Sequence, residues 1–179
     1  YLIHLSSNME SNLSDIKNVE YLIELELKGT IHLLSKCKNL KKIVYSSSMA
    51  VYGKPKYNPV DEKCPTNPIT IYGCTKLATE KFLEIFSKNN GISLSILRFS
   101  SIYGPRNRTN RSIPYFIDLS SKNKSINLIN GGNGYRDFIH VSDAVNFIVK
   151  ALKKKQSGIF NIGYGKKTEI KKLAKEIIT

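Results

Sequence analysis

Short strand-like runs alternate with longer amphipathic stretches along this chain, and this alternation constrains the fold more than any other feature. The runs are rich in aliphatic and β-branched residues, as buried strands are, and they lie at residues 1–5, 42–45, 93–97 and 159–162. The stretches at 18–37 and 71–87 carry apolar residues at helical spacing. Because strands joined by helices pair in parallel, the pattern predicts an α/β fold with a doubly wound parallel sheet.

The last third of the chain contains shorter elements. We predict a helix at 114–122, strands at 126–129 and 137–140, and two helices with N-caps at Ser142 and Thr168. A hydroxyl side chain at the N-cap accepts a hydrogen bond from a free N–H group of the first helical turn. The glycine cluster GGNG that ends at Gly134 does not open a helix after a buried strand, so it predicts a turn and not a phosphate-binding loop.

The charge of the chain raises the question of a nucleic-acid partner. Its 179 residues carry a formal net charge of +14, from 28 Lys and Arg against 14 Asp and Glu. Of these 28 residues 23 are Lys, and they are scattered without the interleaved aromatics or the arginines that nucleic-acid readers use. The charge therefore indicates a solvated surface and argues against nucleic acid. No apolar run approaches the ~20 residues of a membrane span, and we expect no membrane partner.

The cysteines and the two ends of the chain bear on its location and completeness. Cys37, Cys64 and Cys74 lack CxxC spacing and cannot all pair, which favours a reducing compartment and hence a cytoplasmic protein. The three histidines lack metal-ligand spacing, so no metal site is predicted. The chain begins with Tyr1 in a strand-like run and stops inside a helical pattern, which leads us to interpret it as a fragment.

Tyr72 and Lys76 form the sharpest chemical signal. They lie four residues apart on the predicted helix at 71–87, so their side chains share one face. A tyrosine titrates near ~10, whereas a general base at neutral pH works best near ~7, and closing that gap costs ~4 kcal/mol. A nearby ammonium provides the charge that stabilises a phenolate. The same spacing also occurs by chance as a surface pair, so a second element is needed.

A serine cluster, Ser46 to Ser48, provides that second element, because it follows the predicted strand at 42–45. A serine hydroxyl at the carboxyl end of a strand can donate a hydrogen bond to an alcohol or carbonyl oxygen held against the tyrosine. The alternative is a serine-rich turn without a chemical role. The order Ser48, Tyr72, Lys76 favours the catalytic interpretation.

Further short motifs extend from one end of the chain to the other. They are Ile3-His4-Leu5-Ser6-Ser7, Gly29-Thr30, Val51-Tyr52-Gly53, Pro59-Val60-Asp61-Glu62, Asn67-Pro68, Leu97-Arg98, Tyr103-Gly104-Pro105, Gly134-Tyr135-Arg136-Asp137-Phe138-Ile139-His140-Val141 and Phe160-Asn161-Ile162-Gly163. Taken in order with the serine cluster and the Tyr–Lys pair, they resemble the extended short-chain dehydrogenase/reductase superfamily. Within it they resemble the NAD-dependent epimerase/dehydratase family, which includes UDP-glucose 4-epimerase. The resemblance covers nearly the whole chain, and the ordered set carries it.

The resemblance implies a catalytic triad of Ser48, Tyr72 and Lys76. In such a triad the tyrosine exchanges a proton with a sugar hydroxyl, the serine polarises that oxygen, and the lysine binds the nicotinamide ribose. The implied cofactor is NAD, with NADP left open. The residues implied to line it are Leu5, Ser6, Ser7, Ser46, Tyr72, Lys76 and Ser100. The residues implied to bind the nucleotide-sugar substrate are Ser48, Ser101 and Arg136, where the forked arginine suits a diphosphate.

The same resemblance implies how the chain is organised. Residues 1–112 correspond to the C-terminal part of an NAD(P)-binding Rossmann domain, and residues 113–179 to a partial substrate-binding lobe with late Rossmann-associated elements. The glycine-rich phosphate-binding sequence is expected before Tyr1, and the end of the sugar lobe after Thr179. A homodimer is implied, through the helices near 20–37 and 71–87.

Three departures from the family pattern refine the expected reaction. Glu26 stands where the family has an asparagine, and Ser101 stands in place of another asparagine. Met49-Ala50 replaces the Asp-Glu pair that 4,6-dehydratases of the family use to eliminate water. Dehydration is therefore disfavoured, and 4-epimerisation or 4-ketoreduction of a nucleotide sugar remains. The alternatives are a non-catalytic relative that acts as a binding protein, for RNA among other ligands, and an inactive truncated remnant.

Overall fold

The computed structural model describes residues 1–7, 16–107, 110–154 and 156–178. It divides the chain into two compact units, Tyr1–Phe99 with Asn146–Ile162 and Ser100–Val145 with Gly163–Thr179. Each unit is therefore built from two separate stretches of sequence. The division of the chain at residue 112 into a cofactor domain and a substrate lobe stays a prediction.

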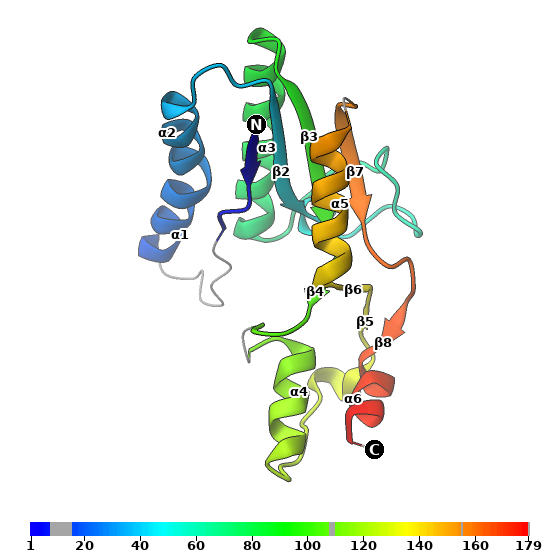
Figure 1. Ribbon diagram of the computed structural model, residues 1–179. Coiled ribbons are helices and arrows are strands. Elements are labelled where there is room, and N and C mark those ends of the chain that lie inside the picture. The colour runs from blue at the N-terminus through cyan, green and yellow to red at the C-terminus, as the bar shows by residue number, and fades with distance from the viewer. Residues whose placement is uncertain (8–15, 108–109, 155, 179) are drawn as a thin grey trace. The chain divides into compact units, whose positions relative to one another are not determined.

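The first unit is built around a four-stranded parallel sheet with the strand order β1-β2-β3-β7. Its strands are β1 (Leu2–His4), β2 (Lys42–Ser48), β3 (Ser93–Phe99) and β7 (Gly158–Ile162). Helix α3 (Ile71–Asn89) connects β2 to β3 on one face of the sheet, and α5 (Val141–Lys153) precedes β7 on the other (Figure 1). The predicted doubly wound parallel sheet is confirmed.

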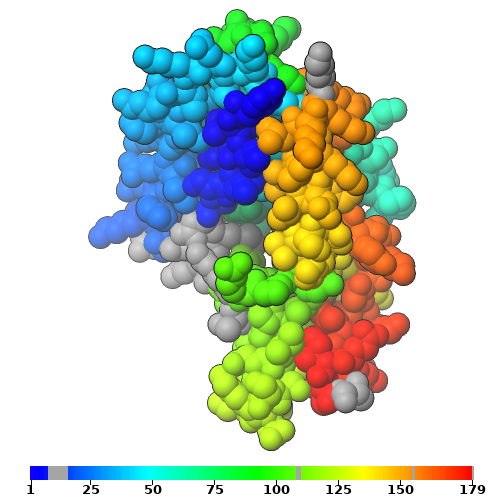
Figure 2. All heavy atoms as spheres, viewed as in Figure 1, coloured from blue at the N-terminus to red at the C-terminus, as the bar shows by residue number. Residues whose placement is uncertain are grey.

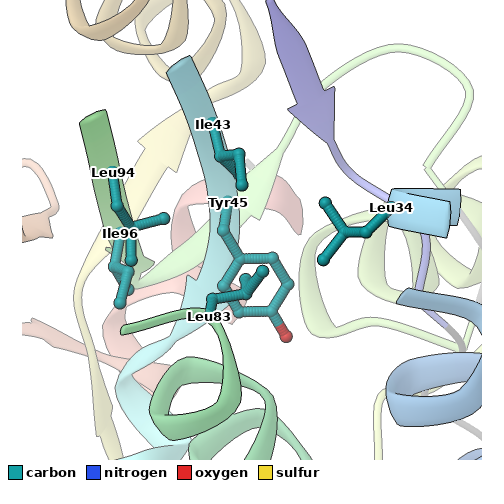
Figure 3. Close-up of a cluster of buried hydrophobic side chains, with 6 residues drawn as sticks. All are labelled: Leu34, Ile43, Tyr45, Leu83, Leu94 and Ile96. Carbon is teal, nitrogen blue, oxygen red and sulfur yellow. The ribbon is translucent and has the colours of Figure 1, made fainter. Parts of the chain in front are cut away.

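The core of this unit lies between the sheet and α3. Six buried side chains from α2 (Gly29–Lys36), β2, α3 and β3 form it (Figure 3), and they are Leu34, Ile43, Tyr45, Leu83, Leu94 and Ile96. Burying a side chain of this size contributes about 1.5–3 kcal/mol. Tyr45 differs from the other five because its hydroxyl points out of the cluster (Figure 3). Through that hydroxyl the apolar core contacts a buried polar group, the carboxylate of Glu26.

The predicted helix at 18–37 is interrupted. It consists of α1 (Ile16–Ile23), a π-helical segment η1 (Glu24–Lys28) and α2 (Gly29–Lys36). The backbone N–H of Gly29 donates to the carbonyl of Glu24, five residues earlier, which is the spacing of a π-helix. Glu26 is fully buried at the centre of this segment. Apolar periodicity predicted the helix and could not predict its π-helical interior.

The second unit holds the shorter elements. Strand β4 (Ser101–Tyr103) pairs in parallel with β6 (Phe138–His140), and β5 (Tyr135–Arg136) pairs antiparallel with β8 (Thr168–Glu169). The helices are α4 (Ser112–Ser121) and α6 (Ile170–Ile178), which pack against each other, and a 3₁₀ turn η3 spans Ile129–Gly132. The turn predicted for the glycine cluster is confirmed, because Gly131 and Gly132 have positive φ.

Three local predictions in this unit are wrong. Residues 126–129 do not form a strand; they lead into η3, where Asn130 also takes a positive φ. Ser142 is not an N-cap, because α5 begins at Val141 and the Ser142 hydroxyl lies 2.7 Å from Nδ1 of His140. Thr168 is not a cap either, since it lies in β8 opposite Arg136. In each case a tertiary contact or a turn decides the local structure.

Strand β1 forms one edge of the four-stranded sheet. Its register pairs Ile3 with Val44, and the side chains at this end of the chain (dark blue) lie at the surface in Figure 2. Tyr1 is 82% exposed and Ile3 39%, whereas His4 is buried and Leu2 is half-buried against the core, so the expectation of a buried strand holds for only part of this run. Among the described residues, no helix has both the length and the apolar character that crossing a membrane requires.

Candidate active site

The Tyr–Lys pair lies at the start of α3. Thr70 is the N-cap of this helix, and its Oγ1 accepts a hydrogen bond from the N–H of Gly73 at 3.1 Å. The Nζ atom of Lys76 lies 5.9 Å from the centroid of the Tyr72 ring. The predicted juxtaposition of the two side chains on one helical face is therefore present. Tyr72 is half-buried, whereas Lys76 is fully buried.

Lys76 is held by groups from two other elements. Its Nζ donates to the carbonyl oxygen of Ser46 at 3.0 Å, and it lies 3.1 Å from Oε2 of Glu26 and 4.9 Å from the ring centroid of Tyr45. Burial lowers the pKa of the Lys76 ammonium, and the Glu26 carboxylate is the largest opposing influence. Two N–H groups of the ammonium are thus committed to Ser46 and Glu26.

Ser48 ends β2 and caps the 3₁₀ segment η2 (Met49–Tyr52). Its Oγ accepts a hydrogen bond from the N–H of Ala50 at 3.1 Å. A Cβ atom on Gly73 would lie only 2.6 Å from the carbonyl oxygen of Ala50, so the first turn of α3 packs directly on η2. This close approach brings the segment of Ser48 beside the segment of Tyr72.

A buried ion pair lies beneath this contact. Arg98 donates from Nε to Oε1 of Glu80 at 3.0 Å and from Nη2 to Oε2 at 2.6 Å, and both side chains are at most 3% exposed. Arg98 also donates from Nη1 to the hydroxyl of Tyr52 at 2.8 Å, and the Ser47 hydroxyl donates to Glu80. Sequence reasoning missed Glu80. Its signal was an acidic residue one turn after Lys76 on the buried face of the helix.

The same network fixes the proline-containing loop that connects η2 to α3. The Tyr52 hydroxyl donates to Oδ1 of Asn161 in β7 at 2.8 Å. The backbone N–H of Asn161 in turn donates to Oε1 of Glu62 at 2.7 Å, and its side-chain amide donates to the carbonyl of Val60 at 3.2 Å. The loop between η2 and α3 is therefore anchored to the sheet at the carboxyl ends of its strands.

Glu26 has more partners than its sequence position indicated. Its carboxylate accepts hydrogen bonds from the Ser7 hydroxyl and from the Tyr45 hydroxyl, the latter at 3.3 Å, besides pairing with Lys76. Burial and the nearby Glu26 carboxylate raise the pKa of the Tyr45 phenol well above its usual value, so this hydroxyl keeps its proton and donates. The sequence marked Glu26 as a departure, but only the fold reveals its partners.

The expected cofactor-lining residues follow two adjacent strands. Leu5, Ser6 and Ser7 are exposed and come directly after β1, and Ser46 lies near the end of β2. Ligands of doubly wound sheets bind outside the carboxyl ends of the strands, where these residues lie. Within the described part of the chain, Ser7 reaches Glu26 and Ser46 reaches Lys76.

Ser100, Ser101 and Arg136 belong to the second unit and are described within it. The Oγ atom of Ser100 is buried and has no hydrogen-bond partner among the described residues. The backbone N–H of Ser101 donates to the carbonyl of Asp137 at 3.0 Å. Arg136 is exposed in β5, with one contact from Nη1 to the carbonyl of Tyr135 at 2.9 Å.

Asp137 is a residue whose structural role the sequence did not indicate. Its carboxylate accepts hydrogen bonds from the backbone N–H groups of Tyr164 at 3.0 Å and Gly165 at 3.1 Å. It thereby holds the turn after β7 beside β5 and β6. In the described ranges, His, Cys, Asp and Glu side chains form no group of three or more that could hold a metal ion.

Comparison with known proteins places this geometry in a family. Residues 1–163 match the model of the NAD dependent epimerase/dehydratase family. A candidate UDP-glucose 4-epimerase of Methanocaldococcus jannaschii is 36% identical over 178 residues, which cover 96% of this chain and 58% of that protein. Human dTDP-D-glucose 4,6-dehydratase is 29% identical over 180 residues, which cover 99% of this chain and 51% of that enzyme.

A solved structure agrees with these relatives. UDP-glucuronic acid 4-epimerase of Bacillus cereus, in complex with UDP-glucuronic acid and NAD, superposes with a TM-score of 0.84 at 29% identity. The match covers 94% of this chain and 55% of that one, so the chain spans little more than half the length of the proteins it matches. The sheet, the ordered motifs and the family match agree: the chain belongs to the NAD-dependent epimerase/dehydratase family.

Proposed function

We propose that the intact protein is an NAD-dependent nucleotide-sugar 4-epimerase or 4-ketoreductase whose acid–base groups are Ser48, Tyr72 and Lys76. The observation that carries the proposal is the placement of the Lys76 ammonium, which is fixed by the Ser46 carbonyl at 3.0 Å and lies 5.9 Å from the Tyr72 ring. A buried cation beside a tyrosine favours the phenolate form that a base requires. NADP is the alternative cofactor, because no residue in the described part of the chain is assigned to the adenosine ribose.

The side chains divide the reaction between them. Tyr72 as phenolate takes the proton of the sugar 4-hydroxyl, and as phenol it returns a proton when the 4-keto group is reduced. The Ser48 hydroxyl donates a hydrogen bond to the same oxygen and orients it. Lys76 stabilises the negative charge on Tyr72 in the first step. Fixing these groups on α3 and at the end of β2 avoids the entropic cost of collecting them during the reaction.

Two features of the chain fit the cofactor. Leu5, Ser6 and Ser7 are exposed at the carboxyl end of β1, and within the second unit the buried Ser100 hydroxyl has no partner among the residues described. When bound, NAD would supply the hydride acceptor and donor for the sugar carbon C4. Ser7, Ser46 and Lys76 line the side of the site where the nicotinamide ribose is expected, and Arg136 is the group suited to the substrate diphosphate.

The residues after Ser48 favour redox chemistry at C4 over elimination of water. Met49 and Ala50 form the first turn of η2, and neither a thioether nor a methyl group can exchange a proton. A dehydratase needs an acid and a base at the neighbouring carbons in addition to the C4 machinery. The family includes both reaction types, and this pair of residues favours the epimerase or reductase branch.

Replacing Tyr72 by Phe in the intact protein tests the proposal. We expect turnover of UDP-sugars to fall by at least a thousandfold, because proton transfer loses its donor and acceptor. Circular dichroism should remain unchanged, since the ring is kept. Turnover within tenfold of the unmodified protein would contradict the assignment of Tyr72 as the base.

Product analysis separates the two reactions. An epimerase converts a UDP-sugar into its 4-epimer with no net consumption of cofactor, whereas a ketoreductase consumes one reduced cofactor for each 4-keto sugar. Nuclear magnetic resonance of the sugar products, with cofactor absorbance followed in parallel, distinguishes them. Formation of a 4-keto-6-deoxy sugar would instead identify a dehydratase and overturn the inference drawn from Met49 and Ala50.

We also infer that the protein acts as a cytoplasmic homodimer. Exposed apolar side chains on α1 and α3 support the dimer, among them Ile16 at 68% and Ile85 at 64% exposure. Helices α1 and α3 pack against each other, and exposed apolar residues on such neighbouring helices favour an interface. Fluorescence microscopy of the tagged protein would check its location.

A further inference from the structure

Glu26 places a buried carboxylate against the lysine of the proposed active site. The Glu26 side chain is fully buried, its Oε2 lies 3.1 Å from Nζ of Lys76, and it also receives the hydroxyls of Tyr45 and Ser7. Three donors, from α3, from β2 and from the segment after β1, thus converge on one carboxylate. This satisfies most of the hydrogen-bonding capacity of an ionised carboxyl group.

The backbone around Glu26 is specialised. Glu26 is the buried residue of the π-helical segment Glu24–Lys28, while the side chains of Glu24 and Lys28 on either side of it are 61% and 70% exposed. Its carbonyl accepts a hydrogen bond from the Thr30 hydroxyl, which also contacts His4 at 2.7 Å. π-helical turns are rare and occur frequently at functional sites. The π-helical turn directs one acidic side chain inward, while the charged residues at its two ends stay at the surface.

The position of Lys76 requires a counter-charge. Its side chain is 2% exposed, and burial lowers the pKa of its ammonium. The other ionisable groups that face it are His4 from β1, Tyr45 from β2, and Tyr72 and Glu80 from α3. Of these groups only Glu80 carries a carboxylate, and that carboxylate accepts two hydrogen bonds from Arg98. Among the described residues, Glu26 is the carboxylate that contacts the ammonium directly.

We propose that Glu26 is a positioning residue of this active site, which keeps Lys76 protonated and fixes its ammonium at the Ser46 carbonyl. The role in catalysis rests on the function proposed above, whereas the effect on Lys76 does not. A neutral Lys76 has no charge with which to stabilise the Tyr72 phenolate. Glu26 therefore sets the upper pH at which the site works.

The test follows the protonation of Lys76 directly in the intact protein. Lysine labelled with carbon-13 at Cε gives a resonance for each side chain that shifts when the ammonium loses its proton, and a Lys76→Arg variant identifies the resonance of Lys76. In Glu26→Gln we expect the pKa of Lys76 to fall by about one unit or more, because a charge partner within hydrogen-bond distance is lost. Glu26→Asn repeats the measurement in case the glutamine variant folds poorly.

Glu24→Gln is the matched control. Glu24 lies two residues earlier in the same segment and pairs with Lys28 at 3.1 Å on the surface. Its removal takes away one carboxylate of the same kind without touching the buried cluster, and the Lys76 resonance should titrate as in the unmodified protein. An unchanged Lys76 pKa in both Glu26 variants, or an equal fall in the control, would overturn the proposal.

A pH profile of turnover tests the consequence for catalysis. In Glu26→Gln the alkaline limb of the profile should move to lower pH by about the same amount as the Lys76 pKa, because activity is lost once the lysine is neutral. An unshifted alkaline limb, with turnover present, contradicts the positioning role. If the unmodified protein has no turnover but Lys76 responds as expected, the proposed function fails and the charge-keeping role of Glu26 stands.

Discussion

Gly73 shows how one small residue fixes the distance between two segments of the proposed active site. The position lacks room for a side chain, because a Cβ atom would meet the Ala50 carbonyl at 2.6 Å and the Cβ of Pro68 at 3.0 Å. A backbone carbonyl cannot rotate aside as a flexible side chain can. The start of α3 therefore rests on η2 at a distance that only glycine allows, and this distance sets how close Tyr72 comes to the segment of Ser48.

Replacing Gly73 by Ala should separate these segments. We expect the free energy of unfolding to fall by about 1–3 kcal/mol, as overpacking typically causes. Turnover should fall by about a hundredfold, because displacements of about 1 Å between reacting groups have effects of that size. Urea unfolding and steady-state kinetics measure the two effects. Gly134→Ala is the control, since its Cβ would meet its first neighbour at 3.8 Å; equal effects in both variants would refute the steric argument.

The residues of the site differ in how far the sequence could predict them. Tyr72 and Lys76 were predicted because their contact is local, one turn apart on a helix. Glu26 was recognised as unusual, but its contact with Lys76 joins residues far apart in the chain and depends on the packing of η1 against α3. Glu80 and Arg98 were missed as a pair for the same reason. The proposed roles of Ser48, Ser101 and Arg136 stay predictions.

At the level of elements, the Glu80–Arg98 pair joins α3 to β3, and Tyr52 extends it to η2 and β7. Of these elements, α3 carries Tyr72 and Lys76, and η2 begins directly after Ser48. A fully buried pair of this geometry is strongly destabilising to break, since one charge then remains without its partner. The network fixes these elements relative to one another at the carboxyl ends of the strands, where the proposed site lies.

A single substitution in this pair should destabilise the fold strongly, whereas the double substitution should destabilise it much less. Arg98→Met and Glu80→Leu should each lower the free energy of unfolding by about 3–5 kcal/mol, because each leaves a buried charge uncompensated. The double variant removes both charges and should recover most of that loss. Urea titrations of the four proteins give the coupling energy, and simple additivity of the two losses would show that the charges act independently.

Periodicity predicted the elements whose apolar residues repeat regularly along the sequence. Strands β2, β3 and β7 and helix α3 are of this kind, and β2 and β3 continue beyond the predicted ends because their neighbours pair with them. The strand expected at 126–129 has alternating apolar residues but finds no partner strand among the described residues. A strand depends on cross-strand partners, which a single sequence does not reveal.

At the scale of the whole molecule, the proposed homodimer depends on the apolar helices of the first unit. Ile85→Glu places a charge on α3 where the residue is 64% exposed. Sedimentation velocity should show a change from twice the chain mass to the single chain mass, because burying an unpaired carboxylate opposes association. Ile129→Glu is the control, since Ile129 is 88% exposed in the second unit. A monomeric unmodified protein, or a dimer that survives Ile85→Glu, would rule out this interface.

Tyr45 belongs to two parts of the protein at once, since its ring fills the core around Leu83 and its hydroxyl binds Glu26. An engineer who repacks this core for thermal tolerance therefore also alters the electrostatic setting of Lys76. Even the substitution Tyr45→Phe, which removes one oxygen atom, therefore changes both the stability of the fold and the reactivity of the site. Evolution faces the same linkage, so drift in this core is limited by chemistry as well as by packing.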